Sequence, residues 1–448
     1  MRSHRTLFFL LLLFALAFSC RLAYVLIKQT HMDLSAAELE RAAICLADHG
    51  ELGNAYSDDS GPTAHVSPLY PALLGTIYRV FGSHTPAGRL AQELASILIS
   101  SLGITLLPVL ARRAKLEQGS GWAAAFVLAV LPLNLWVETS GAWEQPAAAL
   151  VLIGILFAVL ALHEGRWQSK WLVLVLGTLT AAAALLSPAL LPAVALMLFG
   201  EFLLREAPRM QLLRALPLFL LPCVLLVGPW VVRNRVVLGG WVALRSNFGM
   251  QLWIGNHPGS NGKSFNLSWD DRDNFIYQNN PYLSRAELSA LQEVGELEYM
   301  RGKQRLAMAW IREHPGEFTS LCFQRFRLFW FPPTDLWDAT APRMNVVKAI
   351  CYSLFGLGMF GEMFFLIFTR HAGRWLWPAA LLGPSLVYLV THVDARYRYP
   401  VFALSALLGC SFLLRTVAFL WKNANGGAWS GFGARLLTGR SPQRDALP

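Results

Sequence analysis

Charged residues are scarce in this sequence: Lys, Arg, Asp and Glu together make up 15% of its 448 residues. Soluble domains contain about 25% of such residues, so the composition argues against a water-soluble fold. Hydrophobic residues instead reach 55%, and the 16 Trp and 27 Phe can supply aromatic belts at both interfaces of a bilayer. The composition therefore predicts an integral membrane protein.

Paired cysteines and metal-binding motifs are missing as well. None of the six Cys stands in a Cys-x-x-Cys pair, and none of the ten His stands in a His-x-His or His-Glu-x-x-His motif. Cys45 and Cys322 could form a disulfide because both fall in loops on the same predicted side of the membrane. Unpaired cysteines are nevertheless the favoured interpretation.

The formal net charge of +10 could indicate a nucleic-acid-binding protein, but the sequence contains no basic patch. The Lys and Arg residues stand instead at the ends of apolar segments, where they orient a membrane protein. We therefore expect membrane lipids, and no nucleic acid, among the partners.

Apolar stretches recur along the chain, and most are ~17–23 residues long, enough to cross ~30 Å of hydrocarbon as a helix. The first is too long for the core of a signal peptide and lacks a clear cleavage site, so we interpret it as an uncleaved span. Ser187 and Pro188 separate two of the stretches, where either a tight hairpin or a kink in one long helix would fit. The predicted spans are 6–27, 88–111, 121–138, 146–163, 171–187, 188–204, 214–232, 347–369, 376–391 and 400–421. The predicted fold class is an all-α polytopic membrane protein of about ten transmembrane helices.

Basic residues give the expected direction of these spans. With the N-terminus inside, Arg112, Arg113, Arg205 and Arg370 all fall in inner loops, as the positive-inside rule requires. Two large loops then face outward, at about 28–87 and 233–346. If 187–188 were a kink, the second half of the chain would be inverted.

The loops and spans suggest four parts. They are an N-terminal transmembrane module with the first outer loop (1–232), a large outer loop subdomain (233–346), the C-terminal transmembrane helices (347–421) and a disordered cytoplasmic tail (422–448). Helical periodicity or amphipathic patterning predicts short helices in the outer loops at 34–48, 70–81, 285–314 and 316–331.

Two acidic residues on the outer side are candidates for catalysis. Glu38 follows the first outer turn, where a carboxylate could act as a general base or bind a sugar hydroxyl. Glu144 follows Trp143 at the outer end of the third span, where burial of a carboxylate costs energy unless the group is solvated or paired. An exposed helix face for Glu38 and an interfacial anchor for Trp143 and Glu144 are the structural alternatives.

Arg396, Tyr397 and Arg398 precede Pro400 at the outer start of the last span. Arginine on the outer side departs from the positive-inside trend, and its planar fork fits phosphate oxygens. These residues could therefore bind a lipid-linked phosphate, although ordinary anionic headgroups would attract them too.

The second outer loop is rich in residues that suit sugar binding. Arg245, Asn247, Trp253 and Asn256 provide hydrogen-bonding groups and an indole that can stack on a pyranose face. A turn-rich loop stabilised by Asn and Gly is the structural alternative. His65, in the first outer loop, completes the set of candidate substrate-binding residues, although an isolated histidine is more often structural than a metal ligand.

These motifs together resemble the bacterial membrane glycosyltransferases of family 39, which have the GT-C fold. The resemblance depends on short stretches whose order and predicted sidedness match the family. They are Glu38–Gly50, Gly61–Gly82, Leu244–Pro258, Gly295–Met300 and Arg396–Pro400.

The resemblance implies a donor sugar linked to a polyprenyl phosphate and transfer to an acceptor, which could be a lipid, a glycan or a protein, at the outer face of a bacterial cytoplasmic membrane. It implies that Glu38 is the essential acid of the first outer loop, that Glu144 is the acid of the second, and that Arg396 and Arg398 bind phosphate. Many relatives have Asp, often followed by Glu, where this chain has Glu38, so Asp33 and Glu40 remain alternative bases.

The sequence leaves open whether a metal is bound and whether the protein is a transporter. A divalent metal could be held by the outer carboxylates, but no spacing in the sequence requires one. A lipid or glycan transporter without transferase activity is the alternative function, and it would place charged residues near the membrane midplane. The spans are expected to contain almost no acid apart from Glu93, which favours the enzyme.

Overall fold

The computed structural model describes residues 2–131, 133–166, 168–204, 209–264, 274–337 and 341–424. These residues form helices joined by turns, and the only strand-like pairings among them are two isolated bridges, Gly53–Pro62 and Lys263–Val393. The predicted tail beyond Ala424 lies outside the described residues. Cys45 and Cys322 carry free thiols, as do the other four cysteines, so the disulfide considered from the sequence is not formed.

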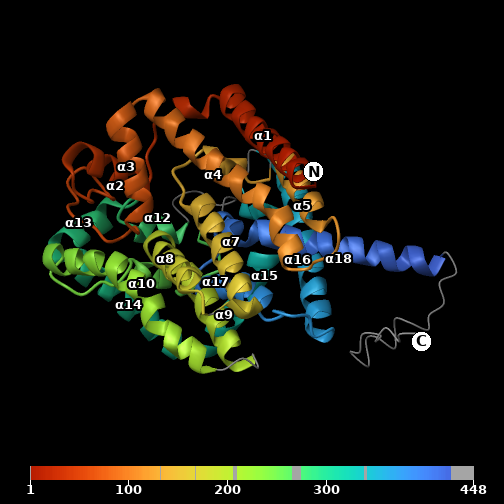
Figure 1. The fold of residues 1–448 in the computed structure, drawn as a ribbon. Helices are drawn as coiled ribbons and strands as arrows, with labels where there is room; N and C mark the ends of the chain where they lie inside the picture. Colours follow the sequence, from red (N-terminus) through yellow and green to blue (C-terminus); the bar gives the residue numbers. More distant parts are fainter. Residues whose placement is uncertain are drawn as a thin grey trace, which may run out of the picture.

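Each predicted span corresponds to an apolar helix, which confirms the all-α polytopic fold (Figure 1). Within the described residues, six helices are long and apolar enough to cross a membrane, and four shorter apolar helices accompany them. The long ones are α1 (Arg2–Lys28), α4 (Pro86–Arg113), α7 (Gln145–Ala161, extended by a π-helical turn to Arg166), α10 (Arg209–Val237), α16 (Pro342–Phe368) and α18 (Tyr399–Ala424). The short ones are α5 (Ser120–Val130), α8 (Lys170–Leu186), α9 (Leu191–Leu204) and α17 (Leu376–Val390). The chain is therefore a multi-pass membrane protein.

The predicted span 121–138 is wrong at its C-terminal end. Helix α5 stops at Val130, and Leu131 adopts an extended conformation with φ −84° and ψ 120°. Leu131 precedes Pro132, and the residue before a proline is sterically disfavoured in the helical region. A separate short helix, α6 (Leu135–Thr139), follows the break.

The bend at Ser187 is a hairpin, so the predicted spans 171–187 and 188–204 are two helices of opposite direction. Ser187 and Glu144, which precedes α7, line the same cavity. Glu201 in α9 contacts His163 at the other end of α7, with 2.7 Å between Oε1 and Nδ1. Pro188 explains the break, because its ring removes a backbone donor and cannot continue the α8 hydrogen-bond ladder.

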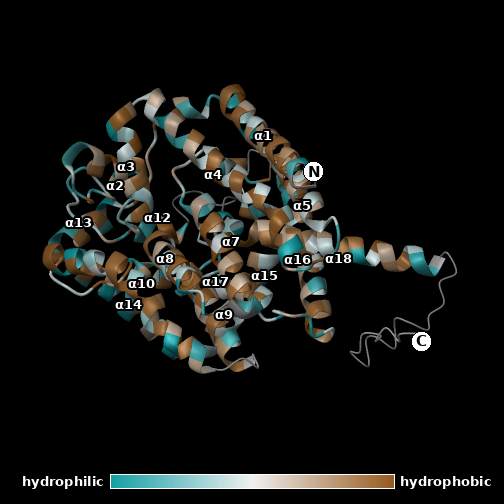
Figure 2. Cartoon of the chain, viewed as in Figure 1, coloured by the Kyte–Doolittle hydropathy of each residue, from teal (hydrophilic) through white to brown (hydrophobic). Residues whose placement is uncertain are grey.

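Most of the remaining helices gather at one end of the bundle, on the side opposite the start of α1 (Figure 1). Hydrophilic residues are concentrated around α2 and α13, whereas hydrophobic residues dominate the long helices (Figure 2). These shorter helices are α2 (Glu38–His49), α3 (Leu69–Phe81), α11 (Phe248–Gly255), α12 (Phe275–Asn279), α13 (Arg285–Val294), α14 (Glu296–Glu313) and α15 (Pro315–Trp330). The loops predicted on one side thus form a single helical cap.

The helix predicted at 34–48 begins only at Glu38, and two further differences concern the second outer loop. The stretch 285–314 is divided at Gly295, whose φ of 81° ends α13 and begins α14. Glycine adopts a positive φ at little cost, so a helix readily ends there. The stretch for which a turn-rich loop was the structural alternative contains the helix α11.

Candidate functional site

A cavity of about 320 Å³ lies where the helical cap meets the membrane helices. Its volume falls in the range of small-molecule sites. The loop after α2, the α6–α7 connection, the Ser187 bend, the segment before α11, and α17 with the turn after it all contribute to the walls. The lining includes these candidate residues: Glu38, His65, Glu144, Arg245, Asn247, Arg396 and Tyr397.

Glu38 is the first residue of α2 and keeps part of its carboxylate exposed to the cavity. Its side chain is 22% exposed, and Oε1 accepts a hydrogen bond of 2.9 Å from the amide of Asn280. The N-terminus of a helix carries partial positive charge and favours an ionised carboxylate. Glu38 therefore presents a charged oxygen where a substrate could bind.

The two alternative acids do not line this cavity. Both carboxylate oxygens of Glu40 lie 2.5 Å from Nη1 of Arg89, and the hydroxyl of Tyr78 donates to Glu40 at 2.6 Å. Asp33 accepts a hydrogen bond from the backbone of Ser35 at 2.9 Å. Glu40 thus ties α2 to α3 and α4, and in doing so fixes the helix start that carries Glu38.

His65 is buried beside Glu38, with 3.7 Å between its Nε2 and Oε1 of the carboxylate. Burial lowers the pKa of His65 and raises that of Tyr56, so both groups stay uncharged near neutral pH. The Tyr56 hydroxyl lies 2.9 Å from Nδ1 of His65. A hydroxyl that donates to Nδ1 leaves the imidazole proton on Nε2, where it faces Glu38.

Glu144 and Arg245 form an ion pair at the edge of the cavity, with 2.8 Å between Oε1 and Nη2. Arg245 also donates to the hydroxyl of Ser67 at 2.8 Å and to the carbonyl of Leu186 at 2.9 Å. Both charges are therefore paired with each other, and the arginine joins three segments that are distant in sequence.

Arg396 is the second cation of the cavity and has a different environment. Its guanidinium lies over the indole of Trp143, 3.8 Å from the ring centroid, in a cation–π contact. Among the described residues, the nearest carboxylate is that of Asp394, 3.9 Å from Nε. Asp394 also accepts a hydrogen bond from the backbone of Arg396, which fixes the 3-10 turn Ala395–Arg398.

Aromatic and amide groups complete the wall next to Arg396. Tyr397 stacks on Tyr388 of α17 with 4.3 Å between ring centroids. Nε2 of His392 lies 2.6 Å from Oε1 of Gln251, and burial lowers the pKa of His392. A neutral His392 can donate to the amide oxygen, which leaves the amide nitrogen of Gln251 as a donor toward the cavity.

The other candidate residues lie away from the cavity. Arg398 is 2% exposed and donates to the carbonyls of Trp330 and Tyr352 at 2.7 and 2.9 Å. Trp253 donates to the side chain of Asn279 at 3.0 Å. Asn256 is fully buried between α11 and the end of α17, and donates to the carbonyl of Val390 at 2.9 Å.

Sequence reasoning did not single out Gln251, Tyr388 or Tyr56. A signal existed for Gln251, because it stands four residues after Asn247 and therefore on the same face of a helix. Recognising it required α11 to be predicted as a helix. Tyr388 lies inside an apolar span, and Tyr56 contacts His65 only through the fold, so neither carried a comparable signal.

Metal ligands are not clustered in this region. No group of three or more His, Cys, Asp or Glu that could hold a metal ion occurs in the part of the chain that the structure describes.

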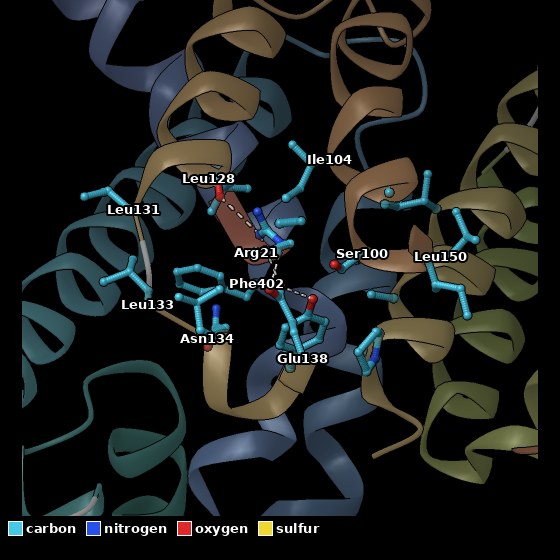
Figure 3. Close-up of a pocket in the computed structure, with 18 residues that line it drawn as sticks. Arg21, Ser100, Ile104, Leu128, Leu131, Leu133, Asn134, Glu138, Leu150 and Phe402 are labelled. Atoms are coloured by element: carbon cyan, nitrogen blue, oxygen red, sulfur yellow. Dashed lines mark hydrogen bonds and ion pairs between the residues drawn. The ribbon is translucent and has the colours of Figure 1, made fainter. Parts of the chain in front are cut away.

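A second polar cluster is buried inside the helix bundle (Figure 3). Nε of Arg21 lies 2.7 Å from Oε2 of Glu138, and the hydroxyl of Tyr399 donates to the same carboxylate at 2.5 Å. Arg21 also donates to backbone carbonyls of α5, including that of Leu128 at 3.3 Å. The adjoining cavity measures only about 40 Å³, room for little more than water.

The fold is similar to that of an archaeal oligosaccharyltransferase, AglB from Archaeoglobus fulgidus. The structure in complex with an inhibitory peptide and a dolichol-phosphate aligns over 98% of this chain with a TM-score of 0.57 and 14% identity. The apo oligosaccharyltransferase of the same organism aligns over 97%, with a TM-score of 0.57 and 13% identity. A third structure, tethered to an acceptor peptide, aligns over 90% with a TM-score of 0.51 and 13% identity.

These alignments confirm the GT-C-type fold expected from the sequence. This chain spans about half the length of the matched structures, 54% for the first two. No protein-family profile and no curated protein sequence matches the chain.

Proposed function

We propose that this protein is a membrane glycosyltransferase that moves a sugar from a polyprenyl-phosphate donor to an acceptor at the cavity. The observation that carries the proposal is that the carboxylate of Glu38 and the guanidinium of Arg396 line the same 320 Å³ cavity. Sugar transfer from a lipid phosphate needs both a base for the acceptor and a cation for the leaving group.

The fold supports this chemistry by analogy. A structural neighbour binds a dolichol-phosphate, a polyprenyl lipid of the proposed class, and an inhibitory peptide. The same fold here has the apolar helices that a long isoprenoid tail requires. Family 39 is the branch whose motifs resemble this sequence, and we propose that the chain belongs near it.

The leaving group accounts for Arg396. As the bond between the anomeric carbon and the phosphate oxygen breaks, negative charge develops on the lipid phosphate. Arg396 rests on the face of Trp143 with its nearest described carboxylate 3.9 Å away, so its charge is only partly compensated and its donors can turn to phosphate oxygens. Arg245 lies in the same cavity but is paired with Glu144, so it contributes less.

Glu38 takes the acceptor proton in this scheme. The acceptor oxygen or nitrogen attacks the anomeric carbon from the side opposite the phosphate, which inverts the centre, and its proton passes to the carboxylate. Asn280 holds one oxygen of Glu38, which fixes the direction in which the other can accept. His65, neutral and adjacent, orients the carboxylate without neutralising it.

We place this cavity on the extracytoplasmic side of a bacterial cytoplasmic membrane. The support is the distribution of basic residues, since Arg112, Arg113 and Lys170 lie at the end of the bundle opposite the cavity. Sugar donors on polyprenyl phosphates suit that side, because no soluble nucleotide sugar is needed there.

A transfer assay with purified protein tests the proposal. Detergent-solubilised protein is incubated with polyprenyl phosphates carrying radiolabelled hexose or pentose, with membrane glycolipids as acceptors, in the presence and absence of a chelator. We expect release of free polyprenyl phosphate, and about a 1,000-fold slower release with Glu38→Gln, from loss of a general base. Asp33→Asn is the matched control and should retain activity. Undiminished release by Glu38→Gln would contradict the assignment of the base.

The transporter alternative makes a different prediction for the same lipid. A transporter would move the intact labelled lipid across a reconstituted bilayer and leave the sugar bond unbroken. Translocation without cleavage would overturn the enzymatic proposal.

A further inference from the structure

We propose that a groove between α8 and α10, at the end of the bundle opposite the cavity, binds an anionic phospholipid of the surrounding membrane. The groove has a volume of about 670 Å³ and opens between the N-terminal turns of the two helices. The proposed transfer reaction does not involve this site.

The groove exists because the two helices touch near their middles and diverge toward their N-termini. Gly177 of α8 packs against the backbone of Phe219 in α10, so closely that a Cβ at Gly177 would meet the Phe219 carbonyl. Cys223 donates from its thiol to the carbonyl of Gly177 at 3.4 Å. Beyond this contact, toward Lys170 and Arg214, no described side chain fills the space between the helices.

Charge at the mouth of the groove indicates an anion. Lys170, the first residue of α8, and Arg214 on α10 both line it and are exposed. Among the described residues, neither cation has a carboxylate within 4.0 Å, unlike Arg113, which pairs with Glu164 at the same end. The amides of Gln168 and Gln211 also line the mouth and can donate to phosphate oxygens.

The deeper wall indicates that the anion carries acyl chains. Val173, Leu218 and Leu221 continue the groove along the membrane-spanning part of the helices. Leu221 is 49% exposed, and the neighbouring Leu220 and Leu216 are 43% and 45% exposed, so this face of α10 meets lipid. Trp171, 73% exposed beside Lys170, marks the level of the membrane interface. A headgroup at Lys170 and Arg214 would therefore place its chains along an apolar surface.

Binding there would bridge helices that also frame the cavity. The carbonyl of Leu186, at the far end of α8, accepts a hydrogen bond from Arg245. Near the far end of α10, Arg233 donates to the carbonyls of Thr63 and Leu52 at 2.8 and 2.7 Å. A lipid that joins the N-terminal ends of α8 and α10 would thus hold together two helices that support the cavity walls.

Binding of fluorescent phosphatidylglycerol to the purified full chain in detergent micelles tests the proposal, with fluorescent phosphatidylcholine as the neutral comparison. The double variant Lys170→Ala/Arg214→Ala should bind phosphatidylglycerol about 30-fold more weakly, at roughly fivefold per basic residue. The control Arg112→Ala/Lys422→Ala removes the same charge from exposed positions elsewhere at this end and should change affinity less than twofold. Charge reversal with Lys170→Glu/Arg214→Glu should abolish the preference for the anionic lipid.

Three outcomes would overturn the site. They are equal losses in the two double variants, equal affinity for the two lipids, and displacement of phosphatidylglycerol by a polyprenyl phosphate at far lower concentration than by unlabelled phosphatidylglycerol. The last would identify the groove as a site for the donor lipid. None of these measurements depends on sugar transfer, so the proposal stands or falls apart from the proposed function.

Discussion

Two arginine–glutamate pairs flank the connection between α6 and α7, and they differ in what surrounds them. Arg21 and Glu138 are 4% and 3% exposed in their side chains and are enclosed by α1, α5 and α18 (Figure 3). Arg245 and Glu144 are 22% and 8% exposed and adjoin the large cavity. The same chemical pair therefore occurs once in a sealed region and once in an open one.

The difference separates structural from functional charge. In the sealed region, Tyr399 and the backbone of α5 supply the remaining hydrogen bonds of the pair, so little capacity is left for a ligand. In the open region, Glu38 and Arg396 keep charged groups directed into a space large enough for a substrate. The size of the adjoining cavity, about 40 Å³ against 320 Å³, rather than residue type, distinguishes the two.

The largest expected effect concerns the sealed pair. Arg21→Ala would leave Glu138 buried without its counter-ion, and removing one member of a buried pair costs about 3–5 kcal/mol. We expect a marked fall in the apparent melting temperature in detergent. Transfer activity per folded molecule should be kept, because the pair does not line the large cavity.

Arg245→Ala is the matched comparison for that experiment. Arg245→Ala should destabilise the fold less than Arg21→Ala does, because solvent in the cavity can hydrate Glu144. The same substitution should weaken substrate binding. If Arg21→Ala proved as stable as the wild type, or if it abolished transfer while the fold persisted, the division between the two regions would be wrong.

Hydropathy was sufficient to predict the membrane helices because every span must satisfy its backbone internally and expose apolar side chains. The prediction of the spans failed in two ways. A proline after Leu131 ended one helix early, and the acidic residues inside the spans were underestimated. The expectation that the spans contain almost no acid apart from Glu93 is wrong, because Glu138, Glu201 and Glu362 also fall within the predicted spans, and all three are buried. Glu362 is compensated by Arg415 at 2.8 Å, a pairing that only the packing of α16 on α18 creates.

The second prediction compares two arginines that stand two positions apart. Arg396→Gln should lower the transfer rate about 100-fold, the effect of losing one charged donor to a developing anion, with thermal stability nearly unchanged. Arg396→Lys should recover part of the rate, because it keeps the charge but not the planar fork.

Arg398→Lys serves as the control and should behave in the opposite way. Its guanidinium binds backbone carbonyls of two segments, so the substitution should destabilise the fold and spare the rate per folded molecule. Equal rate losses for the two positions, with both folds intact, would show that they act as one phosphate site.

Arg396 and Arg398 also show where sequence reasoning ends. Residue type and sidedness drew attention to both, and a 3-10 turn then directs them to different environments. Trp253 and Asn256 were chosen for sugar chemistry, yet their polar groups bind Asn279 and backbone carbonyls. The sequence reveals which residue types could bind a sugar or a phosphate. Whether their hydrogen-bonding groups are already occupied depends on contacts between distant segments.

The third prediction tests how the open region is held in shape. The carboxylate of Glu296 in α14 accepts hydrogen bonds from the backbone of Ala64 at 2.9 Å, from the hydroxyl of Ser246 at 2.6 Å and from that of Thr63. These residues adjoin His65 and Arg245, so Glu296 joins two loops that line the cavity.

Glu296→Gln places an amide where donors converge and should cost about 2 kcal/mol, the range for hydrogen bonds to a charged group. We expect a raised KM for the lipid donor together with the lower melting temperature. Glu298→Gln, on the same helix but paired with Arg305 on the surface, should change neither measurably. A normal KM in the destabilised Glu296→Gln protein would show that the two loops keep their positions without the carboxylate.

The smallest expected effect is a pH dependence that arises in the open region. Burial lowers the pKa of His65, so below pH about 6.5 the unfolded chain binds a proton that the folded chain does not. Stability therefore falls as pH drops below that value, with a slope of at most about 1.4 kcal/mol per pH unit, until the lower folded pKa is reached. The melting temperature of His65→Asn should fall less between pH 7 and pH 5 than that of the wild type. Some slope should remain, because burial also lowers the pKa of His392 and His257. An equal fall in melting temperature between pH 7 and pH 5 for the two proteins would mean that His65 is not held neutral beside Glu38.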